Sequence, residues 1–146
     1  MQLHRDGARW VLRLDEGQEL LATLSELART HGLRAGIVVS GIGMLRRGRI
    51  GYWNGREYEA HELDGPHELV SLHGSIAELD GAPSVHLHVA VAGKDHRLLG
   101  GHLLEGTIGI VGELYLESFE GERFGRRFDA RANLKLLDLE PAASPP

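Results

Sequence analysis

Two dipeptides, Asn54-Gly55 and Asp80-Gly81, do most to limit the folds open to this chain. Asn-Gly and Asp-Gly favour two-residue β-hairpin turns, because both central positions of such a turn accept a positive φ. Each pair lies between two short runs in which apolar residues alternate with polar ones. That alternation is typical of a strand with one face in a core. Successive hairpins of this kind predict an antiparallel sheet.

Short runs of the same type recur along most of the chain. Residues expected in strands are 9–14, 35–40, 47–53, 57–63, 68–79, 84–92, 98–102, 107–117 and 133–137. Gly41 and Gly43 follow the β-branched run at 35–40, so a tight turn is expected there. Short turns join these segments into a largely antiparallel sheet of about seven strands.

One main amphipathic helix is predicted at residues about 16–31. Asp15 can cap it, and Gln18 stands three residues later, as in a capping box. His31 and Gly32 close it, with a cation-capable residue in the last turn and glycine just beyond. Apolar residues form one stripe along the helix at Leu20, Leu21, Leu24, Leu27 and Ala28. A helix that lays this stripe on the sheet gives an α+β domain.

The chain has 146 residues and a mass of 16.0 kDa, which suits one domain with a single core. We expect that domain at residues 1–139 and a disordered tail at residues 140–146 (EPAASPP). The sequence has no run of 18 apolar residues and no signal-like start, so a cytoplasmic protein without a membrane span is expected. Cysteine is absent, which excludes disulfides and thiolate metal ligands.

The charge balance disfavours DNA as a partner. Acidic residues outnumber basic ones by 21 to 16, giving a net charge of −5, whereas DNA-binding domains usually carry a basic excess. Arginines cluster at Arg46, Arg47 and Arg49 and again at Arg123, Arg126 and Arg127. We interpret both clusters as solvated strand edges, where charge prevents unwanted strand pairing.

Four histidines fall within the run HLHVAVAGKDHRLLGGH. His86 and His88 sit one residue apart in a predicted strand, so both point to the same face, about 7 Å apart along the chain. Leu87 and Val89 then face the other side, where they can pack under the helix. The pair alone is more typical of two polar residues on a half-exposed sheet face than of a metal site.

A third histidine strengthens the metal hypothesis. If residues 84–92 and 98–104 pair as a hairpin, His102 approaches the face of His86 and His88. Three neutral imidazoles form a zinc shell of the catalytic type, with a fourth position left open. His96 sits in the turn and is expected to point elsewhere. The other histidines are assigned as follows: His73 as an outside candidate for a residue that supports the ligands, and His4, His31, His61 and His67 as surface residues.

A zinc-bound water would also allow a hydrolase or hydratase. Such chemistry needs an acid or base nearby, and Asp95 and Glu105 are the nearest carboxylates in sequence. Both have simpler explanations, Asp95 as a turn residue and Glu105 as the exposed end of a strand. Catalysis therefore stays an alternative to metal binding alone.

Several motifs, in order from about residue 9 to residue 118, resemble the PPC domain, which plants and prokaryotes share. They are RAGIVVSGIG at 34–43, GYW at 51–53, GPHELVSLHGSI at 65–76, DGAPSVHLHVAV at 80–91 and GGHLLEGT at 100–107. The resemblance implies a compact α+β fold that assembles as a homotrimer. It also implies a divalent metal, zinc by preference, on His86, His88 and His102. A small molecule or an anion would then be a partner at the open metal position.

The resemblance also brings a DNA-binding alternative. In plants this domain follows an AT-hook, a flexible basic segment with the core Arg-Gly-Arg-Pro. The present chain has only Arg47-Gly48-Arg49-Ile50, without the proline and inside a predicted strand. A DNA-associated or regulatory scaffold is therefore an alternative function that the sequence disfavours.

Overall fold

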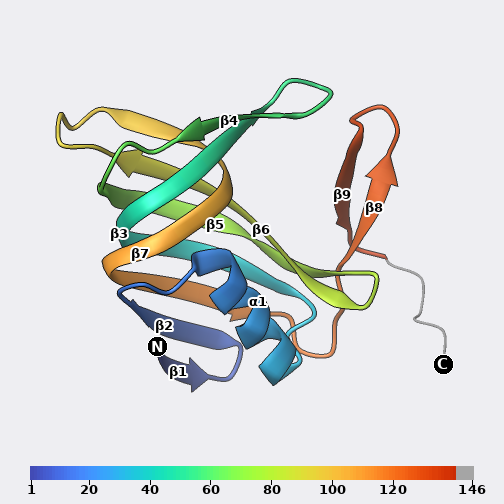
Figure 1. The fold of residues 1–146 in the computed structure, drawn as a ribbon. Coiled ribbons are helices and arrows are strands. Elements are labelled where there is room, and N and C mark those ends of the chain that lie inside the picture. The colour runs from blue at the N-terminus through green and yellow to red at the C-terminus, as the bar shows by residue number, and fades with distance from the viewer. Residues whose placement is uncertain (141–146) are drawn as a thin grey trace.

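The computed structural model describes residues 1–140, which form one helix and nine strands (Figure 1). The elements are β1 (Gln2–Asp6), β2 (Arg9–Asp15), α1 (Leu20–His31), β3 (Gly36–Trp53), β4 (Tyr58–Glu62), β5 (His67–Leu79), β6 (Ala82–Ala92), β7 (Leu98–Ser118), β8 (Gly125–Asp129) and β9 (Leu134–Asp138). The α+β class is as predicted, with nine strands in place of about seven. Within the same residues no helix has the length and apolar character needed to cross a membrane.

Four strands pair in a closed cycle at the centre of the fold. β3 pairs with β5, β5 with β6, β6 with β7, and β7 with β3, all antiparallel. β1 and β2 extend the sheet beyond β7, and β4 pairs with β3. A cycle of this kind encloses one side of each central strand, as in a small barrel.

Two predicted pairs of strands are each one long, bent strand. Residues 35–40 and 47–53 both belong to β3, and the expected tight turn between them is absent. Gly43 lies there with a φ of +143°, and a Cβ on it would stand 2.1 Å from the carbonyl oxygen of Val111. The glycine therefore permits a bend and a close approach of β7, with register shifts at the same place. The predicted segments 98–102 and 107–117 likewise merge into β7.

The helix begins four residues later than predicted. Gln18 Oε1 accepts a hydrogen bond from the Asp15 backbone N–H (2.7 Å), but this closes a turn before the helix. Glu19 is the N-cap, and its carboxylate accepts from the backbone N–H groups of Ala22 (2.8 Å) and Gly106 (3.0 Å). The N-cap thus also ties the helix to β7. The C-terminal end at His31 and Gly32 is as predicted.

The core lies between α1 and the sheet. Leu20, Leu24 and Leu27 of the helix are buried, as the leucine stripe predicts. From β6, Leu87 and Val89 are buried on the side that α1 covers. The predicted placement of these two residues under the helix is confirmed.

The C-terminal hairpin is the part of the fold that the sequence predicted least well. β8 was not predicted, and it pairs antiparallel with β9. The hairpin joins the sheet through one parallel bridge between Glu78 of β5 and Gly125 of β8. It stands at the opposite end of the sheet from β1, which was also not predicted (Figure 1). Of the expected tail, residues 141–146 lie outside the described residues.

Candidate metal centre

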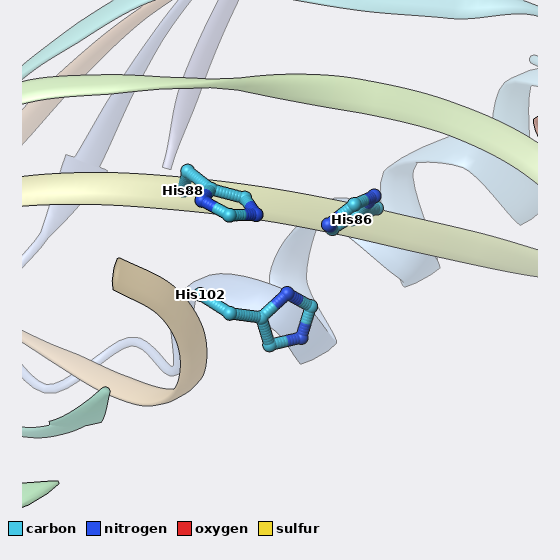
Figure 2. A group of neighbouring side chains, drawn as sticks. All are labelled: His86, His88 and His102. Carbon is cyan, nitrogen blue, oxygen red and sulfur yellow. The ribbon is translucent and has the colours of Figure 1, made fainter. Parts of the chain in front are cut away.

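The three predicted ligand histidines come together through one strand pairing. β6 and β7 form the expected hairpin, and in its register His88 lies directly opposite His102. His86 lies two residues away on β6 and therefore on the same face. Figure 2 shows His86 and His88 on one strand, with His102 reaching toward them from the neighbouring one.

The side chains are close enough to share an ion. One ring nitrogen from each residue lies within 4.8 Å of those of the other two. The ring centroids of His86 and His102 are 4.8 Å apart. The ring centroid of His88 lies 5.1 Å from that of His86 and 5.5 Å from that of His102. The residues thus form a three-nitrogen cluster that could hold a metal ion.

Two of the three rings have buried nitrogens without a partner. Nε2 of His86 and Nδ1 of His102 make no hydrogen bond to any described residue. Burial lowers the pKa of His86 to about 4, and the nearby His102 and Arg126 side chains add to the shift. Burial, followed by the charges of His88 and Arg126, also lowers the pKa of His102. Both rings are therefore neutral at pH 7, the state in which imidazole binds a metal.

Tyr58 of β4 fixes the orientation of His102. Its ring stacks on the imidazole with a centroid distance of 4.5 Å and an interplanar angle of 21°. Trp53 of β3 is the register partner of Tyr58, and the two ring centroids are 5.1 Å apart. Its Nε1 donates to the Ala132 carbonyl oxygen (3.2 Å). The β3–β4 hairpin is thereby joined to the β8–β9 hairpin beside the cluster.

A cavity of about 420 Å³ opens next to the cluster. His86 and His102 form one side of it, together with Tyr58. Arg126 of β8 reaches into the same space, and its Nη2 donates to Ser75 Oγ (2.8 Å). Leu134, Leu136 and Leu137 of β9 also line the cavity. Among the described residues, no carboxylate lines this cavity.

The two predicted carboxylates lie elsewhere. Asp95 is exposed in the turn between β6 and β7, where it accepts from the Arg97 backbone N–H (3.1 Å) and pairs with the Arg97 side chain. Glu105 lies three residues beyond His102 on β7 and pairs with Arg49. Neither lines the cavity beside the histidines.

The remaining histidines do not join the cluster. His73 is opposite His88 in the β5–β6 register, but its ring bonds to Ser71 Oγ and to the Val39 carbonyl oxygen, both at 2.7 Å. His96 lies in the turn with a φ of +61°, away from the cluster as expected. His67, predicted at the surface, is instead buried, and its Nδ1 bonds to the carbonyl oxygen of Gly65.

Sequence reasoning missed Tyr58 and Arg126 as neighbours of the cluster. From the sequence, Arg126 is expected on a solvated strand edge. It does lie on a short strand, but its side chain is half-buried against the histidines. No local pattern signals this contact, because it depends on the position of the whole β8–β9 hairpin.

Comparisons with known proteins agree with this architecture. The family model for the Plants and Prokaryotes Conserved (PCC) domain matches residues 1–120. The chain is similar to a plant- and prokaryote-conserved (PPC) protein of Pyrococcus horikoshii, at 34% identity over 94% of this chain and 93% of that one, with a TM-score of 0.83. It is also similar to a metal-containing protein of Archaeoglobus fulgidus, at 33% identity over 93% and 97% of the two chains, with a TM-score of 0.82.

A curated relative is much longer. The chain is 35% identical over 136 residues to the bifunctional protein GlmU of a Synechococcus strain. The matched region covers 92% of this chain and 21% of that protein. The chain thus spans about a fifth of that relative's length. Because the family match covers most of the residues that form the sheet and all three histidines, the chain belongs to the plants and prokaryotes conserved domain family, the PPC family that its motifs resemble.

Proposed function

We propose that this protein binds one zinc ion per chain through His86, His88 and His102. The observation that carries the proposal is the pair of buried ring nitrogens, on His86 and His102, that have no partner among the described residues. A buried polar atom without a hydrogen bond costs about 1–3 kcal/mol. An ion at the centre of the cluster would give both nitrogens a ligand bond. The similarity to a metal-containing protein from Archaeoglobus fulgidus supports the presence of a metal site, without naming the metal.

The donor set suits zinc. Neutral imidazoles bind Zn²⁺ at about 2.0–2.1 Å, and three of them leave one tetrahedral position open. Ligands of one such ion lie about 3.4 Å apart, whereas the present nitrogens lie within 4.8 Å of one another. Binding therefore requires the rings to turn toward a common point, which the exposed His88 side chain is free to do.

The metal content of the purified protein tests the proposal. After dialysis against zinc and removal of free metal, elemental analysis should give close to one zinc per chain. His88→Ala should reduce this to a small fraction, while His61→Ala, a substitution of an exposed histidine on β4, should leave it unchanged. Wild-type protein with no zinc would refute the proposal, and so would an equal zinc content in all three proteins.

We further propose that the protein is a homotrimer. The sheet face turned away from α1 carries apolar side chains on neighbouring strands. Val11 and Tyr115 are register partners there, Ser40 adjoins Tyr115, and Ile42 follows on β3. The exposed fractions are 40% for Val11, 43% for Tyr115 and 47% for Ile42. Burial of this face between copies of the chain would remove apolar surface from water.

Light scattering coupled to gel filtration tests the assembly. A mass close to three times the 16.0 kDa of the chain is expected. Ile42→Glu should lower that mass, because it introduces a charge into the apolar face, whereas Ile110→Glu serves as a matched change of an exposed isoleucine on β7. A wild-type mass of one chain at all concentrations would contradict the trimer.

The two alternative functions find less support. The arginines of the first cluster are engaged within the chain: Arg46 pairs with Glu16, Arg47 donates to Thr107, and Arg49 pairs with Glu105. Charges paired in this way contribute little to DNA binding. A hydrolase or hydratase would need a base beside the open metal position, and neither of the predicted carboxylates lies there.

A further inference from the structure

We propose that the cavity beside the histidine cluster binds a small organic acid, whose carboxylate is held by Arg126 and whose apolar part lies against β9. The inference rests on the proposed metal function, because the ion and the guanidinium together form the anion site. Three observations carry it: the unbalanced charge of Arg126, the position of that charge beside two metal ligands, and the apolar wall of the cavity.

Arg126 is a half-buried cation without a counter-ion among residues 1–140. Its one hydrogen bond to a described residue goes from Nη2 to the neutral Ser75 Oγ, and it forms no ion pair with a described carboxylate. A guanidinium has five N–H donors, so four remain for a ligand. The neighbouring Arg127, in contrast, donates two hydrogen bonds to the carboxylate of Asp138 on the same hairpin. A partly desolvated cation of this kind favours an anion as its partner.

The surroundings add further positive charge. Arg126 lines the same cavity as His86 and His102. Lys135 also lines the cavity. With a divalent cation on the histidines, the site would hold several positive charges and no described carboxylate. An anion placed between Arg126 and the cluster would interact favourably with all of them.

The walls of the cavity favour an organic anion over a free phosphate. Beyond the polar end, the lining is aliphatic, with Leu79 and Val85 from the sheet and Leu134 and Leu136 from β9. A volume of about 420 Å³ lies within the range of small-molecule sites. Carboxylates suit the fork of a guanidinium, which can donate two parallel N–H bonds to them. The chemistry therefore points to a carboxylic acid with a short hydrocarbon chain.

Calorimetric titration of the zinc-loaded protein tests this assignment. The probes are 4-methylpentanoate, its neutral analogue 4-methylpentanamide, and inorganic phosphate. We expect 4-methylpentanoate to bind at least about tenfold more tightly than either of the others, because only it offers both a carboxylate and an aliphatic chain. Arg126→Gln should weaken its binding at least about tenfold, and Arg126→Lys should weaken it less.

Controls separate this inference from the metal proposal. Arg131→Gln removes an exposed arginine of the same hairpin that pairs with Asp129, and it should leave probe binding unchanged. Zinc content is measured in every variant and should stay at one per chain. Equal binding of the acid and the amide, tighter binding of phosphate, or unchanged binding in a zinc-loaded Arg126→Gln variant would each overturn the organic-acid site while leaving the zinc site intact. Failure of the wild type to load zinc would instead overturn the proposed function.

Discussion

The two faces of β6 differ in their surroundings. On one face Leu87, Val89 and Val91 are buried in the core that α1 covers. On the other face His86 and His88 lie in a half-open cluster, flanked by Tyr58 of β4 and by the β8–β9 hairpin. The same alternation of side chains thus places core residues on one face of β6 and the histidines on the other. Substitutions on the two faces should therefore have separable effects.

The largest effect is expected on the core face. Leu24→Ala removes a fully buried side chain from α1 and should lower the free energy of unfolding by about 2–5 kcal/mol, through lost burial and the cavity left behind. Zinc binding by the folded protein should persist. Leu98→Ala, the same change at an exposed position, should alter stability by less than about 0.5 kcal/mol. Denaturant unfolding at fixed zinc concentration measures both.

The next effect is on the histidine face and depends on metal. Zinc at 100 times its dissociation constant should stabilise the wild-type protein by about 2.7 kcal/mol, since the ion binds the folded state. His86→Ala should abolish this gain while changing the metal-free stability little, because it removes a buried nitrogen that has no partner within residues 1–140. A metal-independent collapse of the variant would show that the two faces are not separable.

A smaller effect is expected from the support of the cluster. Tyr58→Leu keeps an apolar side chain but removes the ring that stacks on His102. Aromatic pairs of this kind contribute about 0.5–1.5 kcal/mol, so zinc affinity should fall by a corresponding factor of about 2–13. A competition titration with a zinc chelator measures the change. Tyr52→Leu, at an exposed tyrosine of β3, provides the control.

The smallest effect is expected at Glu105. Its ion pair with Arg49 is exposed, and exposed pairs contribute about 0–1 kcal/mol. Glu105→Gln should therefore lower stability by no more than that and leave zinc content unchanged, as measured by unfolding and elemental analysis. A large loss of zinc in this variant would contradict the position of Glu105 outside the histidine cluster.

Local patterns predicted the elements that carry their own signal. The leucine stripe gave a helix with the correct C-terminal end, and the Asn-Gly and Asp-Gly pairs lie at the expected hairpins. The period of two placed His86 and His88 on one face. The third histidine required one further step, the assumption that neighbouring strands pair as a hairpin, and the register of His88 with His102 confirms it.

Other features have no local signal. Gly43 was interpreted as part of a turn, yet its positive φ serves a bend in one long strand, and only the nearby Val111 carbonyl distinguishes the two. Asp15 and Gln18 resemble a capping box, but Glu19 caps the helix because its carboxylate also reaches Gly106 on β7. In both cases a contact distant in sequence decides between two local structures of similar energy.

The sequence by itself determined the α+β class, the helix, most strands and the three histidines, since each of these follows from spacing along the chain. The tertiary structure alone decided what surrounds the histidines. Arg126 stands 24 residues beyond His102 in number and lines the same cavity only because the β8–β9 hairpin joins the sheet at β5. Periodicity records which way a side chain points from its own strand, but not which distant segment packs against it. For that reason the charge and the cavity beside the cluster became visible only in three dimensions.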